Sequence, residues 1–145
     1  MSDQDYRRDT AMAVETTPEA AAPSAAEFGS NSMNADNVRD EAAKQSVDKE
    51  FKEFWTAYLA YEDDGRLADV IEGADMVEAA ARGQQPHRLG KEVVNYIWEK
   101  MDKTWDALRE VRESLGPFAI TDKGKVQKSM DALAAQKEYY SDFTH

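Results

Sequence analysis

The chain has 145 residues, with 18 Lys and Arg, 29 Asp and Glu, no Cys and a formal net charge of −11. A chain of this length holds one domain with a core of its own. The excess of carboxylates repels phosphates and anionic lipids, which argues against general nucleic-acid binding and membrane binding and favours a basic partner. The lack of cysteine excludes disulfides, thiolate metal sites and a cysteine nucleophile.

No segment approaches the roughly 20 apolar residues that a transmembrane helix needs. The first nine residues are polar, and no apolar stretch follows Arg7 and Arg8, so an export signal is not indicated. The sequence therefore favours a soluble protein of the cytoplasm, of a virus-infected host cell or of a virion.

Residues 1–35 differ in composition from the rest of the chain. They are acidic and rich in Ala, Ser and Pro, with prolines at 18 and 23 and few large apolar groups. Such a segment buries too little surface to offset its chain entropy, so we predict a disordered tail before a helical domain over 36–145. The tail is either a plain linker or a segment that folds on a partner; its candidate anchors are then Tyr6, Met12, Val14 and Phe28.

The first predicted helix opens near Asp36 or Asn37, either of which can cap the first turn, and runs to Tyr61. Its apolar residues recur at spacings of three and four, which places them on one stripe of a helix. Gly65 is the expected left-handed residue of the turn that follows. The stripe consists of Val47, Phe51, Phe54, Tyr58 and Tyr61, widened by Trp55 and Leu59.

A shorter helix is predicted over Arg66–Arg82, closed by Gly83. Gly73 lies in its middle and weakens it by up to about 1 kcal/mol relative to Ala, so the segment is one helix, a kinked helix or two pieces. Gln84-Gln85-Pro86 forms the connector to the next element.

The longest uninterrupted pattern is predicted to form a helix from His87 to Ser114, stopped by Gly116-Pro117. Its apolar residues alternate in steps of three and four without a slip, which is the seam of a left-handed bundle or a coiled coil. The pattern is the same whether the seam pairs within one chain or between chains, so both arrangements stay open. The seam consists of Val94, Ile97, Met101, Thr104, Leu108, Val111 and Leu115.

The last helix is expected to start at Thr121 as N-cap, with Asp122 suited to the positive end of the helix dipole, and to end near Tyr140. Its inner stripe is Val126, Met130, Leu133 and Tyr140. No segment alternates with the period of a β-strand. The predicted fold is all-α: a small bundle of three long helices with one shorter or kinked helix, preceded by the disordered tail.

No constellation of catalytic or metal-binding residues is evident. His87 and His145 are the only histidines, and neither follows a Glu by three residues, so the ligand pattern of a di-iron bundle is missing. The acidic run Glu62-Asp63-Asp64-Gly65 fails as a calcium loop because Gly65 and Leu67 fall where oxygen ligands are needed. No nucleophile elbow or phosphate-binding glycine loop occurs. We therefore expect no enzyme, no cofactor and no metal.

Aromatic residues point to binding instead. Phe51, Phe54, Tyr58 and Trp98 are expected in the core, but a small bundle does not easily enclose every aromatic side chain. The remainder are then candidates for an exposed patch, because aromatic groups are favoured at the centres of interfaces. The predicted partner-binding residues are Trp55, Tyr61, Trp105, Tyr139 and Phe143.

The sequence thus predicts a non-enzymatic interaction or assembly protein that docks to another protein, or to itself, through an apolar-aromatic helix face. Two alternatives remain. An acidic inhibitor or DNA mimic would block a basic site and would carry its carboxylates in rows, whereas here acids are interleaved with Lys and Arg. A self-assembling scaffold or virion-associated component would pair the seam from Val94 to Leu115 between chains.

Overall fold

The computed structural model describes residues 31–144, so the predicted disordered tail lies outside the described residues up to residue 30, as does His145. The chain divides into two units between Asn37 and Val38 in the sequence, and the unit from Val38 onward is the helical bundle. In the described part there are four α-helices, named α3 (Asn31–Asp64), α4 (Leu67–Arg82), α5 (Lys91–Ser114) and α6 (Ile120–Ser141), and a short 3-10 turn η1 (Pro86–Arg88). The predicted all-α bundle of three long helices and one shorter helix is confirmed.

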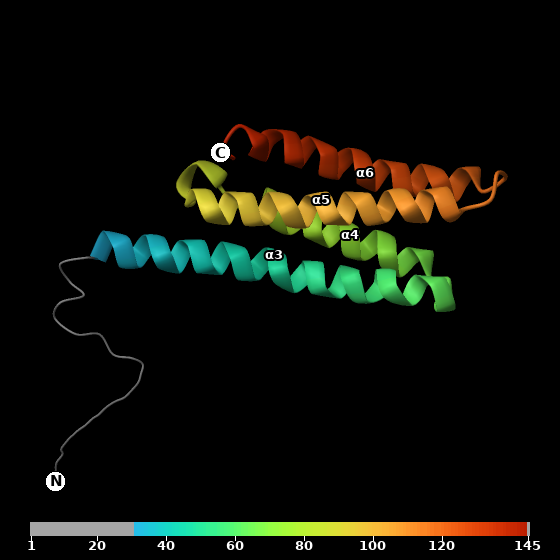
Figure 1. Cartoon of the computed structure of the whole chain (residues 1–145), viewed down its shortest axis with the longest axis horizontal. Helices are drawn as coiled ribbons and strands as arrows, with labels where there is room; N and C mark the ends of the chain where they lie inside the picture. The colour runs from blue at the N-terminus through green and yellow to red at the C-terminus, as the bar shows by residue number, and fades with distance from the viewer. Residues whose placement is uncertain (1–30, 145) are drawn as a thin grey trace, which may run out of the picture. The chain divides into compact units, whose positions relative to one another are not determined.

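Polar contacts between helices define how the helices run. Tyr96 of α5 bonds Asp48 of α3, and further along both helices Tyr58 of α3 bonds Glu110 of α5, so α3 and α5 run in the same direction. α4 and α6 also run together, with Ser129 bonded to Asp75. The chain therefore goes up, down, up and down, and α4 and α5 lie between α3 and α6 (Figure 1).

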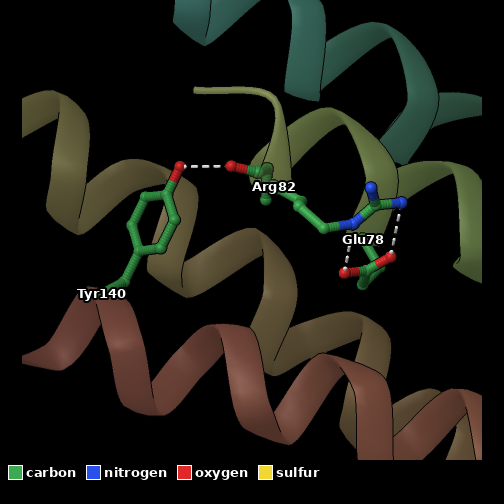
Figure 2. Close-up of polar contacts among 4 residues, drawn as sticks. Glu78, Arg82 and Tyr140 are labelled. Carbon is green, nitrogen blue, oxygen red and sulfur yellow. Dashed lines mark hydrogen bonds and ion pairs between the residues drawn. The ribbon is translucent and has the colours of Figure 1, made fainter. Parts of the chain in front are cut away.

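α6 is attached to its neighbours along its whole length. Lys137 forms a 2.7 Å ion pair with Asp102 of α5. At its C-terminal end the hydroxyl of the buried Tyr140 donates a 2.7 Å hydrogen bond to the carbonyl of Ala81, at the end of α4 (Figure 2). One turn away, Arg82 and Glu78 form an ion pair on the outer side of α4. The buried hydroxyl thus has a partner, which removes the cost of burying it.

The predicted α5 seam lies inside the chain's own core. Six of its seven residues are buried, and Leu115, at the end of the helix, is half-buried. Thr104 is the one polar member, and its hydroxyl donates to the carbonyl of Lys100 one turn earlier, so it brings no unsatisfied group into the core. The inner stripe predicted for α6 is buried as well. The structure therefore places the seam within one chain.

Three helix starts differ from the predictions. α3 begins at Asn31, and Asp36 and Asn37 lie inside it, because no Gly or Pro interrupts the chain between Gly29 and Gly65. α5 begins at Lys91 after Gly90, not at His87, because Pro86 starts a separate 3-10 turn. α6 begins at Ile120, with Ala119 as N-cap in place of Thr121; the carbonyl of Ala119 accepts the amide of Lys123 at 2.9 Å.

Two glycines have conformational or steric roles. Gly65 has φ +66°, and its amide donates to the carbonyl of Tyr61, as expected for a residue that ends a helix. Gly73 does not break α4. It packs directly against the backbone of α3, and a Cβ atom added there would stand 2.8 Å from the Cα of Phe54. The absent side chain at Gly73 is therefore what allows this contact between the helices.

We expect Gly73→Ala to destabilise the protein by about 1–3 kcal/mol, since the new methyl group meets backbone that cannot move aside without shifting α3. Gly124→Ala in α6 is the matched control, because nothing lies within 4 Å of its added Cβ. That control should gain up to about 1 kcal/mol from helix propensity. Urea unfolding measures both, and a stabilised Gly73→Ala variant would contradict the close approach.

Removing a buried seam residue should lower stability in a way that does not depend on protein concentration. Leu108→Ala is expected to cost about 2–5 kcal/mol, while Leu59→Ala, at a side chain that is 62% exposed, should change stability by about 0.5 kcal/mol or less. The test is the urea midpoint at two protein concentrations well apart. A midpoint that rises with concentration would mean that the seam is completed by a second chain.

Candidate functional site

The five aromatic residues predicted to bind a partner are distributed over three helices. Trp55 and Tyr61 lie on α3, Trp105 on α5, and Tyr139 and Phe143 at the end of the chain. All except Tyr139 are half-buried and pack against the core; Tyr139 is 47% exposed. In the described part, the one ring contact among the five joins Tyr139 to Phe143, at 5.6 Å. Their role in binding stays a prediction.

Contacts within the chain already occupy several of these rings. Trp55 stacks on Phe51, with ring centroids 5.5 Å apart. The ammonium group of Lys137 lies 5.1 Å from the centre of the Trp105 ring and 5.2 Å from that of Trp98. Cation–π contacts of this kind stabilise the pairing of α5 with α6. For Trp55 and Trp105, packing inside the bundle accounts for much of the ring surface.

The most exposed large apolar side chains lie elsewhere, in the α5–α6 connector. Phe118 is 93% exposed, and Ile120, the first residue of α6, is 76% exposed. We call these two residues the end surface. The half-buried Leu67 and Ile71 begin a groove between α4 and α6 at the same end of the bundle, since both helices start there. Two large apolar side chains this exposed, two residues apart in the chain, make the end surface a candidate docking site.

The connector that carries the end surface is held on both sides. The amide of Ala119 donates to the carbonyl of Gly116 at 3.1 Å, which closes a tight turn around Pro117. Just before it, the Ser114 hydroxyl lies 3.5 Å from that of Tyr61 on α3. Phe118 is therefore presented on an ordered turn, which reduces the entropy lost when a partner binds.

Sequence reasoning did not select Phe118 or Ile120. With a helix stop predicted at Gly116-Pro117 and an N-cap at Thr121, both residues fall between helices, and the pattern of helix stripes gives no weight to residues there. A signal was nevertheless present: two large apolar residues follow Gly116-Pro117 in a short connector, where polar residues are the norm.

Polar contacts around Tyr96 connect α3 and α5. The Tyr96 hydroxyl donates a 2.8 Å hydrogen bond to the carboxylate of Asp48, and the ammonium of Lys100 lies 4.9 Å from the centre of the Tyr96 ring. Burial raises the pKa of Tyr96 to about 12, and the bond to Asp48 and its negative charge add to the effect. Burial alone would raise the pKa of Asp48, but the bond from Tyr96 and the nearby Lys52 bring it below its ordinary value.

No group of three or more His, Asp or Glu side chains in residues 31–144 is arranged to hold a metal ion. None of the helices in this range has an apolar stretch long enough to cross a bilayer.

The class that the fold defines is an up-down-up-down four-helix bundle. No protein family, no curated protein and no solved structure matches this chain.

The raised pKa of Tyr96 predicts how the free energy of unfolding depends on pH. Since the pKa of Tyr96 is about 12 in the folded chain and near 10.0 in an unfolded one, the unfolded chain loses this proton first as pH rises. The contribution of protonated Tyr96 to the free energy of unfolding is complete below pH 10 and is lost between about pH 10 and 12.

Tyr96→Phe should therefore flatten the fall in unfolding free energy between about pH 10 and 12. The measurement is urea unfolding of both proteins over a pH series. Equal slopes for the variant and the unsubstituted chain would show that Tyr96 titrates alike in the folded and unfolded states.

Proposed function

We propose that this chain is a non-enzymatic protein-interaction or assembly protein, and that it docks to another protein through the end surface. The observation that carries the proposal is the 93% exposure of Phe118 beside the exposed Ile120. A side chain of that size in water costs free energy that burial in an interface would recover, at about 25 cal/mol for each Å² removed from water. On composition, we place its activity in the cytoplasm, in a virus-infected cell or in a virion.

Features of the bundle favour this function over a scaffold built on the α5 seam. A scaffold of that kind needs the seam residues free to meet a second chain, whereas here they are buried against the chain's own helices. Assembly through the end surface needs no such rearrangement, because Phe118 and Ile120 already face solvent. Self-assembly therefore stays within the proposal only as docking of the end surface on a second copy.

A DNA mimic is less well supported by the distribution of charge. On α5 and α6 the acids alternate with Lys and Arg, so these helices carry no continuous rows of carboxylates. α4 is different, with four carboxylates and Arg82 as its one basic residue. Acidic surface restricted to one part of the bundle suits a basic protein partner better than it imitates a whole duplex.

The proposal is tested by placing the photo-crosslinking amino acid p-benzoylphenylalanine at position 118 in cells that express the protein. We expect a discrete adduct with one other protein, or with a second copy, and we expect Ile120→Ser to reduce its yield. The matched control carries the same amino acid at Ala135, an exposed position on α6. No adduct at 118, or the same set of adducts from both positions, would remove the end surface as a docking site.

A further inference from the structure

A groove separate from the end surface lies between the second half of α3 and the first half of α4. Its volume is about 490 Å³. Its lining includes small and apolar residues, which we call the floor: Ala57 and Ala60 of α3, and Gly73 and Met76 of α4. Met76 is 46% exposed. Because Gly73 is part of it, the floor depends on the close approach of α3 and α4 described above.

The shape of this floor suits a helix more than an extended peptide. Ala57 and Ala60 are three residues apart on α3, and Gly73 and Met76 are three apart on α4, so each pair faces the same side of its helix. Small residues at such positions leave a furrow into which the side chains of a third helix can pack. An extended peptide that binds by adding a strand would need a sheet edge to pair its backbone, and residues 31–144 contain no strand.

The rim of the groove is acidic and largely uncompensated. Five carboxylates line it, and Arg66 is its one cation. Arg66 lies 3.8 Å from Asp69, and both side chains are more than half exposed, so that pair is weak. Within the described residues, the other four carboxylates have no ion-pair partner within 4.0 Å. These four are Glu50, Glu53, Asp64 and Glu72.

The net charge of the chain disfavours a second copy as the occupant of the groove. Each copy carries a formal net charge of −11, so bringing another copy to an acidic groove adds repulsion. A cationic segment instead gains attraction from the four carboxylates that lack a partner. Its apolar side must at the same time cover Met76, because charge alone would leave that side chain in water.

We propose that the groove between α3 and α4 binds an amphipathic helix of another protein, with Lys or Arg along its flanks and an apolar stripe against Met76. The groove and the end surface are different surfaces, so binding here does not depend on Phe118. The complex would join two helices of this chain to a third from the partner, a mode in which apolar anchors give affinity and flanking charges give orientation.

The test uses a fluorescent synthetic peptide of about 18 residues, built from Leu and Lys so that the leucines form one stripe when the peptide is helical. A second peptide has the same composition in an order that destroys the stripe. Fluorescence anisotropy with the full chain measures both affinities. We expect the amphipathic peptide to bind at least about tenfold tighter than the reordered one and to weaken as salt is added.

Matched variants locate the binding. The groove variant Glu50→Gln, Glu53→Gln, Glu72→Gln should weaken the amphipathic peptide at least about tenfold. The control variant Glu99→Gln, Glu113→Gln, Glu138→Gln removes the same charge from exposed positions on α5 and α6, and should change affinity by about twofold or less. Met76→Gln keeps the net charge and side-chain length, and should also weaken binding several-fold. Circular dichroism checks that each variant keeps its helices.

Four results would overturn the proposal. Equal losses in the groove and control variants would mean that the peptide responds only to net charge. Equal affinity for the two peptides, or an unchanged affinity in Met76→Gln, would remove the apolar contact. Absence of binding would remove the site. The crosslink from position 118 should persist in the groove variant, so failure of the groove and failure of the end surface are distinguishable.

Discussion

Burial of the α5 seam is the constraint on which the other helices depend. Its apolar side chains recur every three or four residues over most of α5, and in the bundle they meet α4 on one side and α6 on the other. α3 adds the buried Val47, Phe51 and Phe54 to the same core, and polar contacts such as that of Tyr96 with Asp48 join it to α5 as well. With the seam of α5 buried in this way, little of its apolar surface remains exposed, and the most exposed large apolar side chains are those of Phe118 and Ile120.

The contact at Gly73 has consequences beyond packing. Because α4 carries no side chain there, its axis comes close to α3, and the outer side of the pair becomes a furrow with a floor of small residues. The solvent-facing residues of the same two helices are mainly acidic, so the furrow acquires a negative rim. The furrow of the hairpin of α3 and α4 thus carries four carboxylates that have no ion-pair partner within 4.0 Å among the described residues.

Much of the fold could be predicted because helix periodicity is a local property of the chain. The stripe of α6, the seam of α5, the buried Val47, Phe51 and Phe54 of α3 and the left-handed Gly65 all depend on residues within a few turns of one another. Leu59, which was expected to widen the α3 stripe, is instead 62% exposed. The starts of the helices were harder to predict from the sequence. Asp36, Asn37 and Thr121 have good capping side chains, yet Asn31 and Ile120 begin the helices, and neither α4, α5 nor α6 has a side-chain cap bond. Capping preference is worth about 1 kcal/mol, which packing against the other helices easily exceeds.

The candidate sites, like the fold, were only partly predictable from the sequence. The sequence by itself determined that the protein is acidic and that it folds into helices. Only the tertiary structure decided that Trp55 and Trp105 pack against the core while Phe118 faces solvent, and that carboxylates from α3 and α4 share one groove. The physical reason is that periodicity specifies the inner face of each helix, whereas exposure and grooves depend on how the helices come together.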